Sequence, residues 1–145
     1  MTMSKSIGAF IIIIILSGLG FLVYNTSSSE SIDVELLNNG IQVYRANYCG
    51  SCHTLEIANT RGMFAPNHDT IVQNSADYIA ANVYVGNADS VEAYIYESIV
   101  NPTIFYTPGY EASNHHMPAF THLSDEELTA MVYMLMNQED YVGTE

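Results

Sequence analysis

Two cysteines and a histidine are the most informative residues of this chain for chemistry. They occur in the sequence Cys49-Gly50-Ser51-Cys52-His53, so two thiols lie three positions apart and an imidazole follows directly. Thiols at this spacing can add to the two vinyl groups of one porphyrin and form thioethers, while the imidazole binds the iron. The pattern therefore predicts one heme c, attached covalently through Cys49 and Cys52, with His53 as an iron ligand.

Two other chemistries also use a pair of cysteines at this spacing. A dithiol redox pair needs a thiol with a lowered pKa, and a structural zinc site needs more ligands than the motif contains. The chain has only two cysteines, so a zinc site would have to recruit histidines from elsewhere. The histidines outside the motif are His68, His115, His116 and His122. The dithiol and zinc sites therefore stay open as alternatives to heme attachment.

The iron face opposite His53 needs a second ligand or an open coordination position. Met117 is followed by Pro118, which restricts the backbone, and both lie in a segment without helical periodicity. A thioether sulfur stabilises reduced iron and raises its reduction potential. We therefore expect His53 and Met117 to be the two protein ligands of the iron. The candidates that would replace Met117 are Met63, His115 and His116.

Several other residues have an ordinary structural interpretation. Methionines at helical spacing near the C-terminus are expected to fill the core or lie at the surface rather than bind iron, and these are Met131, Met134 and Met136. His68 and His122 are expected to be ordinary loop histidines. Side chains that could bind the carboxylates of a heme, or else pack or lie on the surface, are Tyr106, Tyr110 and Arg61.

The elements that must position these residues are mainly helical. Apolar residues at three- and four-residue spacings predict helices over residues 33–48, 89–100 and 124–137. Residues 75–85 can form a further short helix. Residues 101–123 contain prolines and aromatic residues without a helical period, which predicts an irregular loop before the last helix.

Individual residues indicate where these helices begin and how they pack. Gly40 lacks a side chain and so permits another helix to approach the first one closely. Asp89 is expected to cap the middle helix. Ser124 and Glu127 have the spacing of a capping box at the start of the last helix.

The N-terminal part of the chain differs from the rest in composition. Residues 7–24 are apolar and uncharged, near the lower limit of the roughly 17–25 residues that cross a bilayer. Lys5 precedes them, which favours a cytoplasmic N-terminus. A cleaved signal peptide is the alternative, although the run is long for one and no small-residue cleavage site follows it. The predicted division is a cytoplasmic N-terminus at 1–6, a transmembrane anchor at 7–24, a polar tether at 25–32, a folded domain at 33–138 and a flexible tail at 139–145.

The charge of the chain is strongly negative. Its formal net charge is −13, with 16 acidic residues against 3 lysines and arginines. Nucleic acid is excluded as a partner, because phosphate binding needs a basic surface. A redox partner with a basic docking surface would be attracted by this field. The alternative is that the acidity serves solubility or reflects an unusual ionic or pH habitat.

The folded domain resembles class I cytochrome c over residues 33–138. The matching features are Gly40, Tyr44, the Cys49–His53 motif, Pro66, Met117-Pro118 and Tyr133. The resemblance implies an all-α fold around one covalent heme, with the first and last helices crossing beside it, preceded here by a single transmembrane helix. It also implies that the Pro66 carbonyl holds the other ring nitrogen of His53. The sequence Ala65-Pro66-Asn67-His68 departs from the usual Gly-Pro-x-Leu.

Residues 94–102, 108–110 and 117–118 look like cytochrome c domains attached to respiratory or photosynthetic membrane complexes. Examples are subunits of alternative complex III, of some terminal oxidases and of nitric-oxide reductase. The resemblance implies a membrane-anchored monoheme electron carrier rather than an enzyme, with its heme domain on the periplasmic side of the cell membrane and other subunits as partners. A heme-based gas sensor or peroxidase-like protein with an open sixth iron position is the alternative.

Overall fold

The computed structural model describes residues 31–140 of the chain. The predicted N-terminus, the predicted anchor at 7–24 and nearly all of the predicted tether lie outside the described residues, as does the end of the predicted tail. Among residues 31–140, no helix has the length and apolar character needed to cross a membrane.

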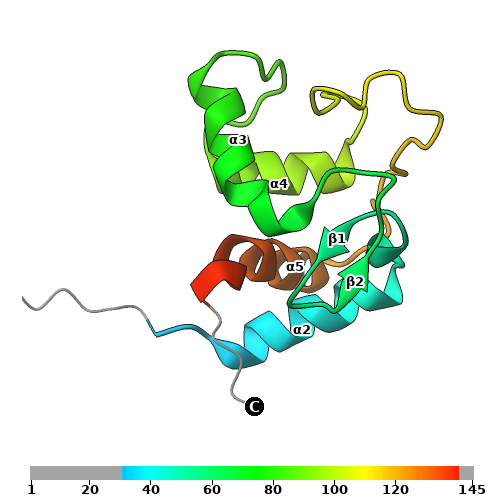
Figure 1. The fold of residues 1–145 in the computed structure, drawn as a ribbon. Helices are drawn as coiled ribbons and strands as arrows, with labels where there is room; N and C mark the ends of the chain where they lie inside the picture. The colour runs from blue at the N-terminus through cyan, green and yellow to red at the C-terminus, as the bar shows by residue number, and fades with distance from the viewer. Residues whose placement is uncertain (1–30, 141–145) are drawn as a thin grey trace, which may run out of the picture. The chain divides into compact units, whose positions relative to one another are not determined.

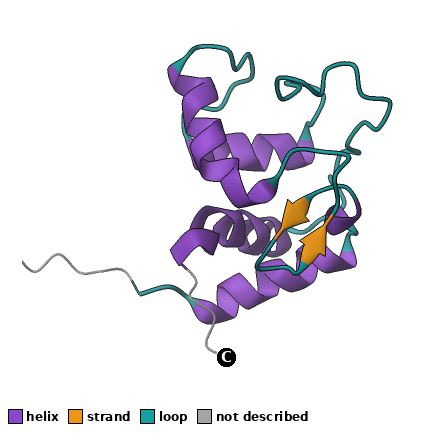
Figure 2. Cartoon of the chain, in the orientation of Figure 1, coloured by secondary structure: helices purple, strands orange, loops and turns teal. Residues whose placement is uncertain are grey.

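Four α-helices and a short β-hairpin form most of the regular structure of residues 31–140 (Figures 1 and 2). The helices are α2 (Val34–Ala46), α3 (Ile71–Ala80), α4 (Val91–Val100) and α5 (Asp125–Asn137). The hairpin pairs β1 (Thr54–Leu55) antiparallel with β2 (Thr60–Arg61). The mainly helical fold agrees with the prediction. The hairpin escapes prediction because two residues per strand are too few to show an alternating pattern.

Helices α2 and α5 lie side by side and make the most extensive helix–helix contact of the described domain (Figure 1). Gly40 of α2 is buried at this crossing, where an added Cβ would overlap the carbonyl oxygen of Ala130 and approach the Cβ of Met134 to 2.5 Å. The hydroxyl of Tyr133 accepts a hydrogen bond of 2.8 Å from the backbone N–H of Asp33, at the start of α2. The close approach expected at Gly40 is therefore confirmed.

The cap predicted for α5 is confirmed, and the one predicted for α4 is wrong by one residue. Ser124 Oγ accepts from the Glu127 N–H at 3.2 Å, and the Glu127 carboxylate accepts from the Ser124 N–H at 2.9 Å. In α4 the cap is Ser90, whose hydroxyl accepts from the Ala93 N–H at 3.2 Å. Asp89 and Ser90 are both good cap residues, and the sequence alone does not distinguish adjacent ones.

Helix α3 begins earlier than predicted. A 3₁₀ turn, η2 (His68–Thr70), leads directly into it, and the side chain of Asn67 accepts from the Asp69 N–H at 2.9 Å to start that turn. Helix α3 ends at Ala80, and Asn82 follows in the left-handed conformation with φ of 53°. Residues 101–123 form an irregular connection between α4 and α5, as predicted.

The hydrophobic core lies between the helices. Its buried members from α2, α4 and α5 include Leu37, Ile41, Tyr44, Tyr94, Ile95, Leu128, Met131, Met134 and Leu135. Met136 is partly buried and packs against this cluster. Of the two positions expected for the three methionines, core or surface, the core is therefore the one observed.

Candidate functional site

The cysteine motif begins two residues after α2 and is folded into a tight turn. Tyr48 adopts the left-handed conformation, with φ of 57°, and turns the chain into the 3₁₀ turn η1 (Cys49–Ser51). The carbonyl of Cys49 accepts hydrogen bonds from the backbone N–H groups of Cys52, at 3.2 Å, and His53, at 3.0 Å. This turn fixes the backbone that carries both thiols and the imidazole.

The segment after β2 packs closely on the motif. The carbonyl of Cys52 accepts hydrogen bonds of 3.1 Å from the N–H groups of both Phe64 and Ala65. Gly62 lies so close that an added Cβ would overlap the backbone of Cys52 and approach the His53 nitrogen to 2.6 Å. The residues that follow the hairpin therefore hold the motif through its backbone.

His53 is buried, with 6% of its surface exposed, and its two ring nitrogens are in different environments. Its Nδ1–H donates to the carbonyl of Pro66 at 2.7 Å. Burial lowers the pKa of His53, while the bond to Pro66 opposes this. The ring is therefore neutral at neutral pH, with its proton on Nδ1. Its Nε2 keeps the lone pair that a metal ligand needs.

A cavity of about 600 Å³ brings the predicted ligand residues together. Cys49, Cys52, His53 and Met117 all line it, and its volume is within the roughly 300–1,000 Å³ typical of cofactor sites. Side chains from α2, α3, α4, α5 and the 101–123 loop complete the wall. The structure thus joins residues that are more than half the domain apart in sequence.

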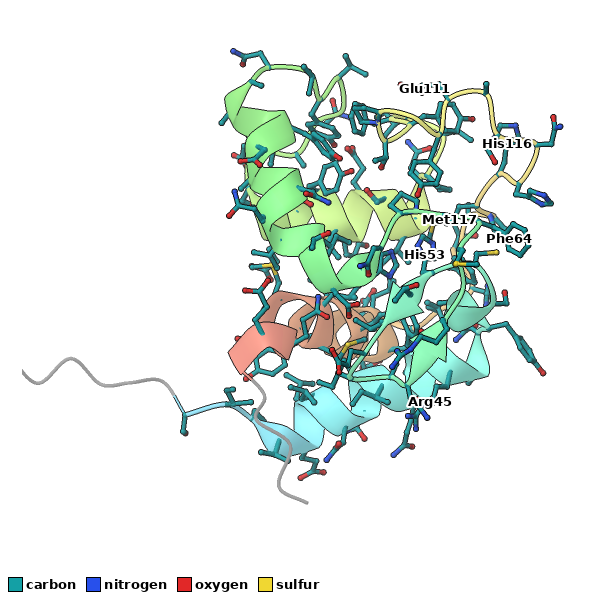
Figure 3. The ribbon with its side chains drawn as sticks, viewed as in Figure 1. Arg45, His53, Phe64, Glu111, His116 and Met117 are labelled. Carbon is teal, nitrogen blue, oxygen red and sulfur yellow. The ribbon has the colours of Figure 1, made fainter. Side chains whose placement is uncertain are left out.

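The residues that compete to be the second iron ligand differ in burial. Met117 is partly buried and packs against the hydrophobic core, whereas His115 and His116 line the cavity but are exposed. Figure 3 shows Met117 near His53 and His116 farther out on the loop. Met63 is 85% exposed and is absent from the cavity lining. The geometry therefore favours Met117.

The cavity wall, which consists of described residues, contains no lysine, arginine, aspartate or glutamate. Arg61 is exposed and donates to the carbonyl of Thr60 at 2.9 Å, away from the cavity. Tyrosines are among the polar residues that line it, namely Tyr78, Tyr94, Tyr106 and Tyr110. Burial raises the pKa of Tyr78 and that of Tyr94, so these hydroxyls stay protonated. Of the two roles that the sequence leaves open for Arg61, pairing with a heme carboxylate or an ordinary surface position, the structure favours the surface position.

The expectation that His68 is an ordinary loop histidine is wrong. Only 9% of its surface is exposed, and its ring stacks on that of His53 with centroids 3.7 Å apart and planes 18° apart. His68 lies two residues after Pro66, where the usual Gly-Pro-x-Leu pattern has a leucine. This apolar residue in the family pattern is the signal that could have indicated that His68 is buried. His122 does behave as expected, because it is exposed and bonds to the Asn47 side chain at 3.1 Å.

These residues fit a covalent heme better than zinc or dithiol chemistry. Burial raises the pKa of the Cys49 thiol to about 11, which disfavours the thiolate that disulfide exchange requires. Within residues 31–140, no cluster of three or more His, Cys, Asp or Glu side chains is arranged to hold a metal ion. The cavity offers thiols, a neutral imidazole and a thioether around a space large enough for a macrocycle.

Comparison with known proteins gives one match. A family model described as Cytochrome c matches residues 37–139, which is most of the chain. The search of curated proteins and the search of solved structures found no match.

Proposed function

We propose that this chain, which belongs to the cytochrome c family, is a membrane-tethered carrier of single electrons within a larger electron-transport complex. Its cofactor is heme c, attached covalently through Cys49 and Cys52. When bound, the heme iron supplies one-electron oxidation and reduction. The observation that carries the proposal is the single cavity lined by both cysteines, His53 and Met117.

The chain's own contribution is to present two unlike ligands on fixed supports. His53 offers Nε2 because its Nδ1–H is held by the Pro66 carbonyl at 2.7 Å, which also makes the imidazole a stronger donor. Met117 offers a thioether from a loop that packs on the core and is stiffened by Pro118. Ligands held in place before electron transfer move little during it, and this suits a carrier.

The sixth position can be tested by comparing two methionine variants of the heme-loaded protein. In Met117→Ala we expect loss of the near-infrared methionine band of the oxidised protein, a lower reduction potential and binding of carbon monoxide to the reduced protein. Met63→Ala is the matched control, because Met63 is exposed and lies outside the cavity lining. We expect its spectrum and potential to equal those of the unmodified protein.

Two outcomes would contradict this ligand assignment. An unchanged band in Met117→Ala would move the ligand to His115, His116 or Met63. Ready binding of carbon monoxide by the unmodified protein would favour a gas sensor or peroxidase-like protein with an open sixth position over a carrier.

The membrane location is proposed from the sequence. Residues 7–24 would anchor the chain, with the heme domain on the periplasmic side, and residues 25–32 would tether it. Because the heme domain is tethered, its encounter with a neighbouring redox centre is effectively intramolecular. The tether therefore raises the effective concentration of the heme domain at that centre. The proposed partners are subunits of a complex of the alternative complex III, terminal oxidase or nitric-oxide reductase type. The net charge of −13 supports a basic docking surface on the redox partner.

Purification of the full chain in mild detergent tests this location and partnership. We expect the chain in the membrane fraction, with quinol- or oxygen-linked subunits purifying with it. A chain lacking residues 1–24, fused to a cleavable export signal so that heme is still attached, is the control and should be released as a soluble heme protein. A full-length protein found in the soluble periplasm would contradict the anchor, and one extracted alone would contradict the complex.

A further inference from the structure

The imidazole of His68 is a part of the site that the heme motif does not explain. Its ring lies almost parallel to that of His53, with centroids 3.7 Å apart and planes 18° apart. His53 is also fixed in its plane by the Nδ1–H bond to the Pro66 carbonyl. A second aromatic ring against its face blocks rotation about the bond that would swing Nε2 away from the cavity.

Three separate elements hold His68 in place. Tyr44 of α2 shares a hydrogen bond of 3.1 Å between its hydroxyl and His68 Nδ1, with the two rings edge to face at 66°. Gln138, directly after α5, donates from its side chain to the His68 carbonyl. Asn67 starts the 3₁₀ turn that carries His68. The histidine therefore joins the first and last helices to the face of His53.

Both members of the Tyr44–His68 pair are buried, because 9% of the surface of His68 and 1% of that of Tyr44 are exposed. A hydrogen-bonded pair at this depth contributes oriented dipoles at the face of His53.

We propose that His68 is a positioning residue for the axial ligand, and that Tyr44 acts through it to fix the plane of the His53 imidazole and to tune the reduction potential of the iron. The inference rests on the proposed role of His53 as an iron ligand and is independent of the identity of the ligand on the opposite face.

The polarity of the His68 ring gives the direction of the effect. Axial imidazole orientation and groups around the ligand are among the means by which a protein sets the potential of a heme. A polar ring within stacking distance of His53 favours the oxidised, more positive iron relative to an alkyl side chain. Leucine, the residue that the class I pattern has at this position, removes both the stacking ring and the hydrogen bond to Tyr44. His68→Leu should therefore raise the potential and loosen the imidazole plane.

The experiment compares heme-loaded His68→Leu, Tyr44→Phe and the double variant by redox titration and by paramagnetic NMR of the oxidised protein. The NMR shifts of the heme methyl groups report the plane of the axial imidazole. We expect His68→Leu to change the pattern of the heme methyl shifts. At a fixed applied potential, the same variant should change the ratio of reduced to oxidised protein by up to about tenfold, which is equivalent to ~59 mV for one electron. We expect Tyr44→Phe to give a smaller change of the same sign.

The double variant identifies the path of the Tyr44 effect. If Tyr44 acts through His68, the double variant equals His68→Leu, whereas additive changes would overturn the part assigned to Tyr44. His122→Leu is the matched control, because this histidine is exposed and outside the cavity lining.

Two results would decide against a positioning role, and a third would decide against the ligand role of His53. Unchanged methyl shifts and potential in His68→Leu would overturn the inference, even if thermal stability fell, because a purely structural residue affects stability alone. If His68→Leu does not fold, the heme methyl shifts and the reduction potential of Tyr44→Phe provide the test. Values equal to those of the unmodified protein would overturn the inference. A His53→Ala variant whose heme spectrum equals that of the unmodified protein would instead refute the ligand role of His53, so the two failures are distinguishable.

Discussion

Replacing Gly40 with alanine tests whether the contact between α2 and α5 is as close as the structure indicates. The change adds one methyl group at the crossing, where it would overlap the Ala130 carbonyl oxygen and approach the Met134 Cβ to 2.5 Å. One obstacle is backbone and the other is the first atom of a buried side chain, so neither can rotate away. The two helices would have to separate to accommodate the methyl group.

The magnitude follows from two opposing contributions. Alanine is favoured over glycine inside a helix by about 1 kcal/mol. Overpacking a rigid site costs about 1–3 kcal/mol, and a clash with backbone lies at the upper end of that range. We expect a net loss of roughly 1–2 kcal/mol in the free energy of unfolding. For a domain of this size that corresponds to a fall in Tm of about 4–12 °C.

Thermal unfolding of the heme-loaded domain, followed by circular dichroism, measures this change. The matched control is Asn39→Ala, at the neighbouring exposed position of the same helix. That substitution gains helix propensity without a clash, so it should raise the stability by up to about 0.7 kcal/mol. A Gly40→Ala variant as stable as Asn39→Ala would show that the crossing is loose and would refute the reasoning.

Two further predictions concern helix capping and the surface charge. Ser90→Ala should reduce the free energy of unfolding by about 1 kcal/mol because it removes the hydrogen bond to the Ala93 N–H. Asp89→Ala should have a smaller effect in the same chemical denaturation assay, and the reverse order would place the cap at Asp89. The net charge of −13 should make electron transfer from a small cationic reagent slower as ionic strength rises from about 0.01 to 1 M, because the Debye length falls from about 30 to 3 Å. An anionic reagent should become faster in the same stopped-flow series, and equal responses to both would contradict electrostatic steering.

The parts of the site that the sequence predicts are those encoded by neighbouring residues. The Cys49–His53 motif requires its spacing for one covalent attachment, so it is recognisable without any knowledge of the fold. The capping box at Ser124 and Glu127 is equally local. Predicting that Gly40 lies against the last helix requires one further assumption, namely that the first and last helices cross.

The parts that escape prediction depend on contacts between distant segments. The sequence predicts a loop position for both His68 and His122. In the structure His68 is buried against His53, whereas His122 is exposed. Their difference arises because Tyr44 and Gln138 reach His68 from elements far away in the sequence. The absence of Arg61 from the cavity lining and the presence of Tyr106 and Tyr110 in it likewise depend on where the hairpin and the 101–123 loop lie.

The neutral cavity wall and the acidic domain surface have separate consequences for redox behaviour. Acidic groups at the surface act on the iron through water and salt, which weaken their effect beyond about 10 Å at 0.1 M ionic strength. Residues such as His68, Met117 and Tyr94 line a cavity whose wall contains no lysine, arginine, aspartate or glutamate, and dipoles act at higher strength there. We therefore expect the reduction potential to follow substitutions in the cavity wall, and the rate of association with partners to follow the surface charge.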